Sequence, residues 1–419
     1  MGAMGDPLFT VSFDTVFLLH FFWKEKEKIM ELNKTPSGER KHISFFGCRN
    51  AGKSSLLNAV TGQQIAIVSD IRGTTTDPVY KALELQPAGP VMVVDTPGLD
   101  DEGILGEMRV KSALKVLRKT DLAVLVVDAA AGMREEDQKI LEHIKEKNIP
   151  FITVYNKIDL RGASVPEGEI GVSAVTGEGI NELKNRIAGL LNEGEEEKTI
   201  AGDLVKPGDL VVLVVPIDKA APKGRLILPQ QQTIRDLLDH GAIPVVSRDV
   251  ELMETMEKLG DLVKLVITDS QAFKRVAEIV PKEIPLTSFS ILFSRYKGEL
   301  EKQLAAIGAV DCLQDGDRIL IAEGCSHHRQ CGDIGTEKIP ALLRRLGDFK
   351  ISFTSGQEFP EDVSDYSLII HCGGCMLNER EMKARIEISD RQGIPVTNYG
   401  MFIAKMTGVL DRSMEPLRK

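Results

Sequence analysis

The chain has 419 residues with 42% apolar and 5% aromatic content, a formal net charge of −10 and a pI of about 5.4. This length exceeds one typical domain, so two or three are expected, and an acidic chain with few aromatic residues makes a nucleic-acid partner unexpected. Five of the six cysteines follow residue 300, which suits a metal or redox site in a cytoplasmic protein rather than a disulfide framework.

The first 29 residues are apolar and aromatic over positions 8–23, but Asp14 and His20 interrupt this run. It is too short to span a membrane and lacks the basic start of a signal peptide. We expect residues 1–40 to be an extension and lead-in, with Met30 as a candidate true start; the alternative is a helix that packs on the chain or binds a partner. No membrane association is expected.

Short apolar runs alternate with helical segments in the next part of the chain, which predicts a doubly wound α/β domain over residues 41–192. Buried parallel strands are expected at 43–46, 91–94, 122–127 and 151–155, and helices at 54–60, 135–147 and 179–191. Acidic residues around a glycine then indicate a solvated linker over residues 193–200.

A small α/β segment is predicted over residues 201–261, and it needs a neighbour or a second copy to complete its core. Strand–helix alternation returns over residues 262–419 and predicts another parallel-sheet domain. The expected strands are 210–215, 243–247, 262–268, 318–322, 350–354, 366–370 and 394–397. The expected helices are 233–240, 271–280, 294–307, 339–346, 378–392 and 402–410.

A complete phosphate-binding loop follows the first predicted strand and opens the next helix. Its glycines let main-chain N–H groups surround phosphate oxygens, and the helix N-terminus adds a favourable dipole. Lys53 is expected to reach the β- and γ-phosphates, and the Ser54 hydroxyl to bind Mg²⁺. The expected nucleotide-binding residues of this loop are Gly47, Asn50, Ala51, Gly52, Lys53, Ser54 and Ser55.

Two further segments lie where Mg²⁺ and the γ-phosphate would be sensed. Asp95 follows the second predicted strand and is expected to hold Mg²⁺, and the Gly98 amide is expected to face the γ-phosphate. Thr75, which lies between the phosphate loop and Asp95 in the chain, is expected to complete the Mg²⁺ shell. Leu99 stands where GTPases of the Ras pattern carry a water-orienting glutamine, which predicts slow intrinsic hydrolysis.

The residues that select guanine follow the fourth predicted strand. Asn156 and Lys157 precede Asp159, whose carboxylate can accept both the N1 and N2 protons of guanine. Adenine offers no matching donors and leaves that carboxylate unpaired. Ser173 and Ala174 supply the last base-contacting turn, so the complete set predicts GTP rather than ATP.

Asn50, together with the Gly-Thr-Thr sequence at 73–75, resembles the potassium-activated GTPases of tRNA modification and ribosome assembly. This resemblance implies that Asn50 binds K⁺ beside the phosphates and acts in catalysis with Lys53, Thr75 and Gly98. The alternative is that Asn50 only stabilises its turn.

Cysteines and histidines follow two predicted strands of the last domain: Cys325 and His327 after one, and His371, Cys372 and Cys375 after the other. Ligands of an open parallel sheet lie beyond such carboxyl ends. A closed zinc site would use Cys325, His327, Cys372 and Cys375. An iron–sulfur cluster would use the three cysteines and leave a weak or open fourth position, and spacing alone does not choose between them.

The Cys-x-His and His-Cys-x-x-Cys motifs, combined with an amino-terminal GTPase, resemble the HydF family of [FeFe]-hydrogenase maturation GTPases. The resemblance extends from about residue 30 to the carboxyl end. Further matching stretches are 73–80, 214–218, 222–225, 266–270 and 394–400.

This resemblance implies an N-terminal P-loop GTPase domain, a central dimerisation domain and a C-terminal iron–sulfur domain. Cys325, Cys372 and Cys375 would hold a [4Fe–4S] cluster, and His327 and His371 would be a fourth ligand or hydrogen-bond its surroundings. Such proteins are homodimers that assemble the two-iron precursor of the hydrogenase cofactor. They receive material from two radical-SAM maturases and deliver the precursor to apo-[FeFe]-hydrogenase, while GTP hydrolysis regulates the exchanges.

Two other interpretations stay open on the residues alone. One is a tRNA-modification or ribosome-linked GTPase with a structural zinc domain. The other is a redox-sensing iron–sulfur GTPase, which would use the same residues as the maturation scaffold.

Overall fold

The computed structural model describes residues 38–63, 78–98, 104–193, 198–217, 226–324, 333–356 and 358–418, with only the main chain of residues 104–110. The expected extension at 1–29 lies outside these ranges. Within them, we find no helix with the length and apolar character that a membrane span requires.

A six-stranded sheet in the order β2-β3-β1-β4-β5-β6 forms the first domain and confirms the predicted α/β class. Neighbouring strands are parallel, except that β2 pairs antiparallel with β3. The central strands β1 and β4 are almost continuously buried because helices cover both faces of the sheet. The strands are β1 (Lys41–Phe46), β2 (Val79–Leu85), β3 (Gly89–Asp95), β4 (Leu122–Asp128), β5 (Phe151–Asn156) and β6 (Ile170–Val172).

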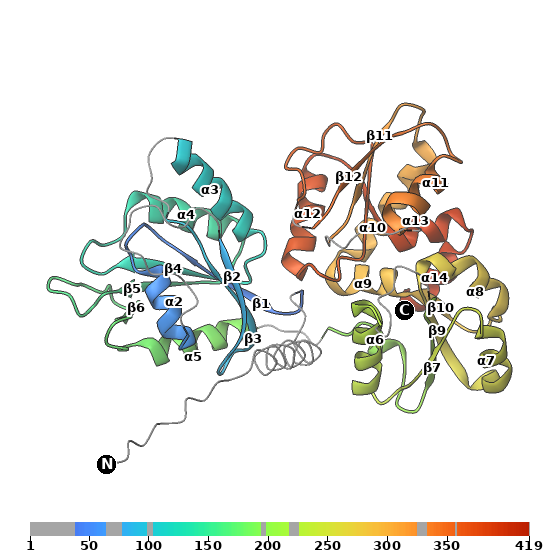
Figure 1. Cartoon of the computed structure of the whole chain (residues 1–419), viewed down its shortest axis with the longest axis horizontal. Helices are drawn as coiled ribbons and strands as arrows, with labels where there is room; N and C mark the ends of the chain where they lie inside the picture. Colours follow the sequence, from blue (N-terminus) through green and yellow to red (C-terminus); the bar gives the residue numbers. More distant parts are fainter. Residues whose placement is uncertain are drawn as a thin grey trace, which may run out of the picture. The chain divides into compact units, whose positions relative to one another are not determined.

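The helices of this domain are α2 (Lys53–Thr61), α3 (Ile104–Leu117), α4 (Glu135–Glu146) and α5 (Ile180–Asn192). α2 and α5 pack on one face of the sheet, and α3 and α4 on the other (Figure 1). The sequence did not predict β2, α3 or the three-residue strand β6. β2 is an edge strand with mostly exposed side chains, so it lacks a buried apolar run, and Gly106 lowers the helix propensity of α3.

A four-stranded parallel sheet in the order β10-β9-β7-β8 forms the second domain. Because β9 and β10 pair beside β7, the predicted division between residues 261 and 262 cuts through this sheet. Alternation of strands and helices continues from one parallel sheet into the next, so it does not mark where strand pairing changes. The elements are β7 (Leu210–Val214), α6 (Leu228–Asp239), β8 (Ile243–Ser247), α7 (Leu252–Leu259), β9 (Val263–Thr268), α8 (Phe273–Ile279), β10 (Leu286–Ser288) and α9 (Phe289–Lys297).

The third domain contains a parallel sheet in the order β12-β11-β13-β14. The single helix predicted over 294–307 is instead the pair α9 and α10, which Gly298 separates at the end of α9. The elements are α10 (Leu300–Ala306), β11 (Arg318–Ala322), α11 (Ile339–Leu343), β12 (Lys350–Thr354), β13 (Leu368–His371), α12 (Glu379–Arg391), β14 (Val396–Asn398), α13 (Tyr399–Met406) and α14 (Leu410–Met414).

The second and third sheets share one apolar core. Val212 and Val266 of the second sheet belong to the same buried cluster as Ile319 and Ile370 of the third. The described residues after position 37 form one compact unit.

Candidate functional site

Two glycines of the phosphate loop are required by close contacts with the chain around them. A Cβ at Gly47 (φ 139°) would lie 2.2 Å from Val126 O, and one at Gly52 (φ 89°) would lie 2.3 Å from Asn156 Nδ2. Larger side chains therefore cannot occupy these positions without moving the main chain. α2 begins directly after Gly52, so the N-terminus of this helix faces the loop, where its dipole favours an anion.

Lys53 lies over this loop. Its Nζ donates hydrogen bonds of 2.8 Å to Gly47 O and to Cys48 O, and the side chain is buried. The ammonium group is thereby held at the phosphate loop, where it adds positive charge to an anion-binding site. Asn50 takes φ 63°, the left-handed conformation that asparagine tolerates.

Ser54 and Asp95 form the candidate Mg²⁺ site. Ser54 Oγ donates a 2.6 Å hydrogen bond to Asp95 Oδ2, and Asp95 is 3% exposed. Burial raises the pKa of this carboxyl, although Ser54 and Lys53 favour the charged form. Within the described residues, Asp95 Oδ1 has no hydrogen-bond partner. A buried carboxylate oxygen without a hydrogen-bond partner, beside a hydroxyl group, is a suitable ligand for a hard divalent cation.

Gly98 approaches the phosphate loop closely. A Cβ at Gly98 would lie 2.9 Å from Arg49 Cβ and 3.1 Å from Arg49 N, so glycine is required by the packing. The Gly98 main chain is thus adjacent to the loop in which the phosphates are expected. Thr75 and Leu99, predicted to act beside it, lie outside the described residues.

Asn156 connects the phosphate loop to the expected base-binding turn. Its Nδ2 donates to Ala51 O over 2.9 Å, and its Oδ1 accepts from the Ala174 N–H over 3.2 Å. Ser173 Oγ accepts N–H groups from the two residues after Ala174, which fixes this turn. Asp159 is exposed, so its carboxylate is open to a ligand.

A residue that the sequence analysis did not single out supports the guanine motif. Asp128 Oδ2 lies 2.7 Å from Lys157 Nζ, which holds the lysine stem beside Gly52. Desolvation opposes ionisation of Asp128, but its bonds from Lys157 and the Ala130 N–H prevail and lower its pKa. Asp128 directly follows the third predicted strand, and this position could have identified it as a site residue.

The candidate metal centre lies at the ends of two neighbouring strands, β11 and β13, in which Ala322 pairs with His371. We call residues 372–378 the thiol loop. Cys372 Sγ accepts hydrogen bonds from the Gly324 N–H (3.0 Å) and the Gly374 N–H (3.4 Å). Gly324, the residue before Cys325 in the chain, is therefore in direct contact with Cys372. This contact agrees with the prediction that the two cysteine motifs lie close together.

Both thiols of the loop are held in low-polarity surroundings. Burial raises the pKa of Cys372, against the effect of its two N–H donors. Burial and the neighbouring Cys372 raise the pKa of Cys375 to about 11, although Lys297 favours its thiolate. A positively charged metal ion would reverse this preference, because it stabilises the thiolate form directly.

His371 is fully buried behind the thiol loop, and both of its ring nitrogens face protein groups. Nδ1 lies 2.8 Å from Cys372 O, and Nε2 lies 3.2 Å from Arg385 NH1. Burial and the adjacent guanidinium lower its pKa to about 3, so the imidazole is neutral. With Nδ1–H donating and Nε2 accepting, His371 in this arrangement orients its neighbours and presents no free nitrogen to a metal.

The described part of the chain brings together no group of three or more Cys, His, Asp or Glu side chains suited to a metal ion. Cys325 and His327 lie outside the described residues, so the predicted three-cysteine set is described only for Cys372 and Cys375.

Three buried polar residues around the thiol loop were not predicted. Lys297 Nζ donates to Cys375 O, Leu377 O and Gly38 O at 3.0–3.2 Å. Arg385 is paired with a buried glutamate of α12, and Asn378 caps that helix. Their positions on amphipathic helices look ordinary in the sequence, and only the tertiary structure brings them to the loop.

Three regions of the chain match models of known domain families. Residues 42–157 match the 50S ribosome-binding GTPase domain, residues 200–298 the Hydrogen maturase F dimerization domain, and residues 301–416 the Hydrogen maturase F tetramerization domain. Together with the nucleotide site, these matches define a P-loop GTPase with two additional parallel-sheet domains. Because both additional domains are those of hydrogen maturase F, the chain belongs to the HydF family.

Curated relatives are similar over a shorter part of the chain. The tRNA modification GTPase MnmE of Nitrosomonas europaea is 38% identical over 169 residues, which cover 38% of this chain and 36% of that protein. GTPase Der of Wolinella succinogenes is 35% identical over 182 residues, covering 39% and 38%. This chain thus spans little more than a third of the length of these relatives.

Among solved structures, Era of Aquifex aeolicus bound to GDP and AlF4⁻ is 22% identical, with a TM-score of 0.33. The match covers 57% of this chain and 97% of that one.

Proposed function

We propose that this protein is a GTP-hydrolysing scaffold and carrier for the two-iron precursor of the [FeFe]-hydrogenase cofactor. It would assemble the precursor on a [4Fe–4S] site, receive material from two radical-SAM maturases and deliver it to apo-hydrogenase. The observation that carries this proposal is the combination, in one HydF-family chain, of a phosphate loop with two half-buried thiols in the loop after β13, the strand that pairs with β11.

At the nucleotide site, the main-chain N–H groups of the loop and Lys53 would bind the β- and γ-phosphates of GTP. Ser54, Asp95 and Thr75 would hold Mg²⁺, which when bound neutralises charge that develops on the phosphates. Asn50 would hold K⁺ near the same oxygens. Asp159 would select guanine, and Gly98 would report the presence of the γ-phosphate.

At the thiol loop, Cys372 and Cys375 would be two of the three cluster ligands, with Cys325 as the third. The N–H donors from Gly324 and Gly374 fit this role because hydrogen bonds to sulfur favour its charged form. A cluster with three protein ligands supplies one iron position that can accept a bridging ligand from a second metal fragment. His371 would act here as an orienting neighbour.

The second domain supports a homodimer. β8 lies at the edge of its sheet, and Ile243 and Val246 on this strand are about half exposed, at 52% and 47%. An apolar edge strand is costly to leave open to water and offers main-chain groups to a partner strand. We propose that a second copy of the chain covers this edge.

The test begins with the full chain, purified and reconstituted without oxygen. Metal analysis and EPR after reduction should give about four irons per chain and a reduced [4Fe–4S] signal. The reconstituted protein, loaded by the two maturases, should then activate apo-[FeFe]-hydrogenase. One tightly held zinc without iron uptake would instead favour the GTPase with a structural zinc domain. Cluster binding without activation of the hydrogenase would favour the redox-sensing GTPase.

Two variants separate the sites. Lys53→Ala should abolish GTP hydrolysis and keep its iron, whereas Cys372→Ser should lose iron and keep GTP hydrolysis. Cys312→Ser is the matched control for the second variant, because Cys312 is exposed and far along the chain from the thiol loop. Full iron retention in Cys372→Ser would refute the ligand assignment.

A further inference from the structure

We propose that Asn378 is a positioning residue that links the nucleotide state of the GTPase domain to the thiol loop. This inference rests on the proposed function, because it names a route by which GTP would regulate the cysteine site. The route runs along α3, through the turn at Lys119–Asp121, to Asn378 and the loop that carries Cys375.

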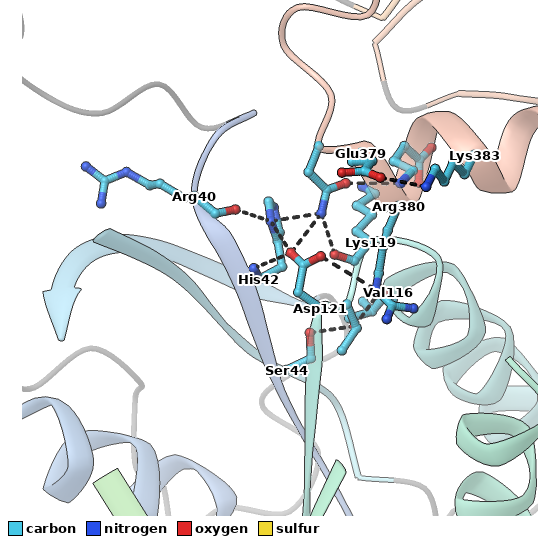
Figure 2. Close-up of polar contacts among 12 residues, drawn as sticks. Arg40, His42, Ser44, Val116, Lys119, Asp121, Glu379, Arg380 and Lys383 are labelled. Carbon is cyan, nitrogen blue, oxygen red and sulfur yellow. Dashed lines mark hydrogen bonds and ion pairs between the residues drawn. The ribbon is translucent and has the colours of Figure 1, made fainter. Parts of the chain in front are cut away.

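Asn378 contacts the GTPase domain through its side-chain amide. Nδ2 lies 2.7 Å from Lys119 O, 3.2 Å from His42 Nδ1 and 3.3 Å from Asp121 Oδ2. Figure 2 shows these three partners close to one another. Asn378 is 6% exposed and His42 8%, so these contacts are shielded from water. Buried polar groups are costly to leave unpaired, which makes this junction sensitive to small displacements.

On the GTPase side, the junction is built into the end of α3. Thr120 Oγ1 donates to Val116 O in the last turn of α3 and contacts Ser44 Oγ of β1, each over 2.8 Å. Asp121 and His42 are joined by two hydrogen bonds of 2.8 Å that involve their main chains. The end of α3, β1 and the start of β4 are therefore one connected unit.

α3 is suited to carry a displacement to this unit. It starts at Ile104, six residues after Gly98, and its 14 residues form a rod about 21 Å long. In GTPases the segments around the γ-phosphate change their arrangement when the phosphate is lost. A shift at the start of a helix reaches its other end because hydrogen-bonded helices resist bending.

On the other side, Asn378 is the third residue after Cys375 and the N-cap of α12. Its Oδ1 accepts the Glu381 N–H over 3.1 Å, so the same side chain caps the helix and contacts the GTPase domain. Lys297 adds a second connection, since its ammonium joins Cys375 O and Leu377 O to Gly38 O, just before β1. A displacement of the GTPase domain would therefore reach the thiol loop through Asn378 and, by way of Lys297, through Cys375 and Leu377.

The two functions of Asn378 can be separated by substitution. Asn378→Asp keeps an oxygen acceptor for the Glu381 N–H but replaces the donor with a carboxylate that faces Lys119 O and Asp121. Adding Asp121→Asn reverses this contact, so that the amide at position 121 donates to the carboxylate at position 378. The amide oxygen at position 121 can still accept the main-chain N–H of His42. Arg391→Gln is the control on the same helix, because Arg391 is exposed and pairs only with Glu387 among the ion pairs described.

The measurement is hydrogen–deuterium exchange of the amides of residues 373–378 in the full chain with Mg²⁺, bound either to GDP or to a non-hydrolysable GTP analogue. The exchange rates should differ between the two nucleotides by about fivefold or more, a typical allosteric coupling. Asn378→Asp should reduce the ratio towards one, Asp121→Asn/Asn378→Asp should recover part of it, and Arg391→Gln should match the wild type.

Equal exchange with both nucleotides in the wild type, or an unchanged ratio in Asn378→Asp, would refute the proposal. The outcome is independent of the cargo. If the protein binds zinc or fails to activate hydrogenase but still shows nucleotide-dependent exchange, the role of Asn378 is supported and the proposed function is refuted. The reverse combination would retain the function and refute the junction.

Discussion

Asn156 ends β5 and Asp159 lies three residues further on, but their surroundings give them different tasks. Asn156 is 1% exposed and connects two loops of the protein, whereas Asp159 is exposed and remains open to a ligand. The first residue therefore fixes the shape of the nucleotide site, and the second is suited to choose the base.

Asp159→Asn should exchange the base preference. The amide oxygen can accept one of the two guanine protons, but the amide N–H group then faces the other donor, so GTP binding should weaken by about 100-fold or more. Xanthosine triphosphate carries a carbonyl oxygen in place of the guanine amino group and can accept the amide N–H, so its affinity should increase. Titration of both nucleotides against the wild type and the variant checks this. Loss of both affinities would mean that the substitution only damages the site.

His42 should make the protein sensitive to mild acid. Burial lowers its pKa, and this outweighs the opposite effect of Asp121. Below a pH of about 6.5, the unfolded chain therefore binds a proton that the folded chain does not, and the free energy of unfolding falls by up to about 1.4 kcal/mol per pH unit until the folded pKa is reached.

The variant His42→Gln isolates this contribution, because glutamine stays neutral and both chains keep Asp121. Thermal unfolding followed by circular dichroism at pH 7 and pH 5.5 should show a larger decrease in Tm for the wild type than for the variant. A wild type that gains stability on acidification, relative to the variant, would show that attraction to Asp121 prevails over burial.

At the scale of elements, α12 supports the thiol loop through a buried ion pair. Arg385 Nε lies 3.0 Å from Glu381 Oε1, and both side chains are at most 4% exposed. The guanidinium also donates to Gly356 O and stacks over Phe359. This pair fixes the inner face of the helix whose first turn receives the thiol loop.

Arg385→Met should destabilise the third domain by about 3–5 kcal/mol, because it leaves the Glu381 carboxylate buried without its partner. Arg385→Met/Glu381→Met should recover much of this loss, since an apolar pair of similar volume needs no charge compensation. Native-state hydrogen exchange of the β13 amides reports the stability of the core that surrounds this sheet. Equal losses in the single and double variants would show that the contacts to Gly356 and His371 dominate.

At the scale of the whole molecule, the second and third sheets share a core while the exposed edge of β8 stays open in the single chain. Matches to dimerization and tetramerization domains indicate that this protein forms oligomers. Closure of the edge by another copy would extend the sheet and remove apolar side chains from water.

Val246→Glu should therefore convert the oligomer into smaller species, as measured by light scattering after size-exclusion chromatography. Each copy would place a charge in the apolar interface, which is costly without a partner. Leu160→Glu is the matched control, because Leu160 is similarly exposed, at 48%, but belongs to the GTPase domain. Equal masses for both variants and the wild type would exclude β8 from the interface.

The α/β class, the phosphate loop and the family were predictable from the amino-acid sequence. These features depend on contiguous residues: main-chain N–H groups can surround a phosphate only if neighbouring positions carry glycine and lysine in a fixed order. Most strands of the first domain were also predictable, since strands buried on both faces are continuous apolar runs.

The division of the strands among the sheets and the polar surroundings of the thiol loop became visible only in the folded chain. β9 and β10 joined the second domain because strand pairing is a long-range choice that local alternation does not record. Asn378 and Lys119 are 259 residues apart, and each looks like an ordinary surface residue in its own segment. Their contact exists because folding brings distant surfaces together and excludes water between them, which no local pattern encodes.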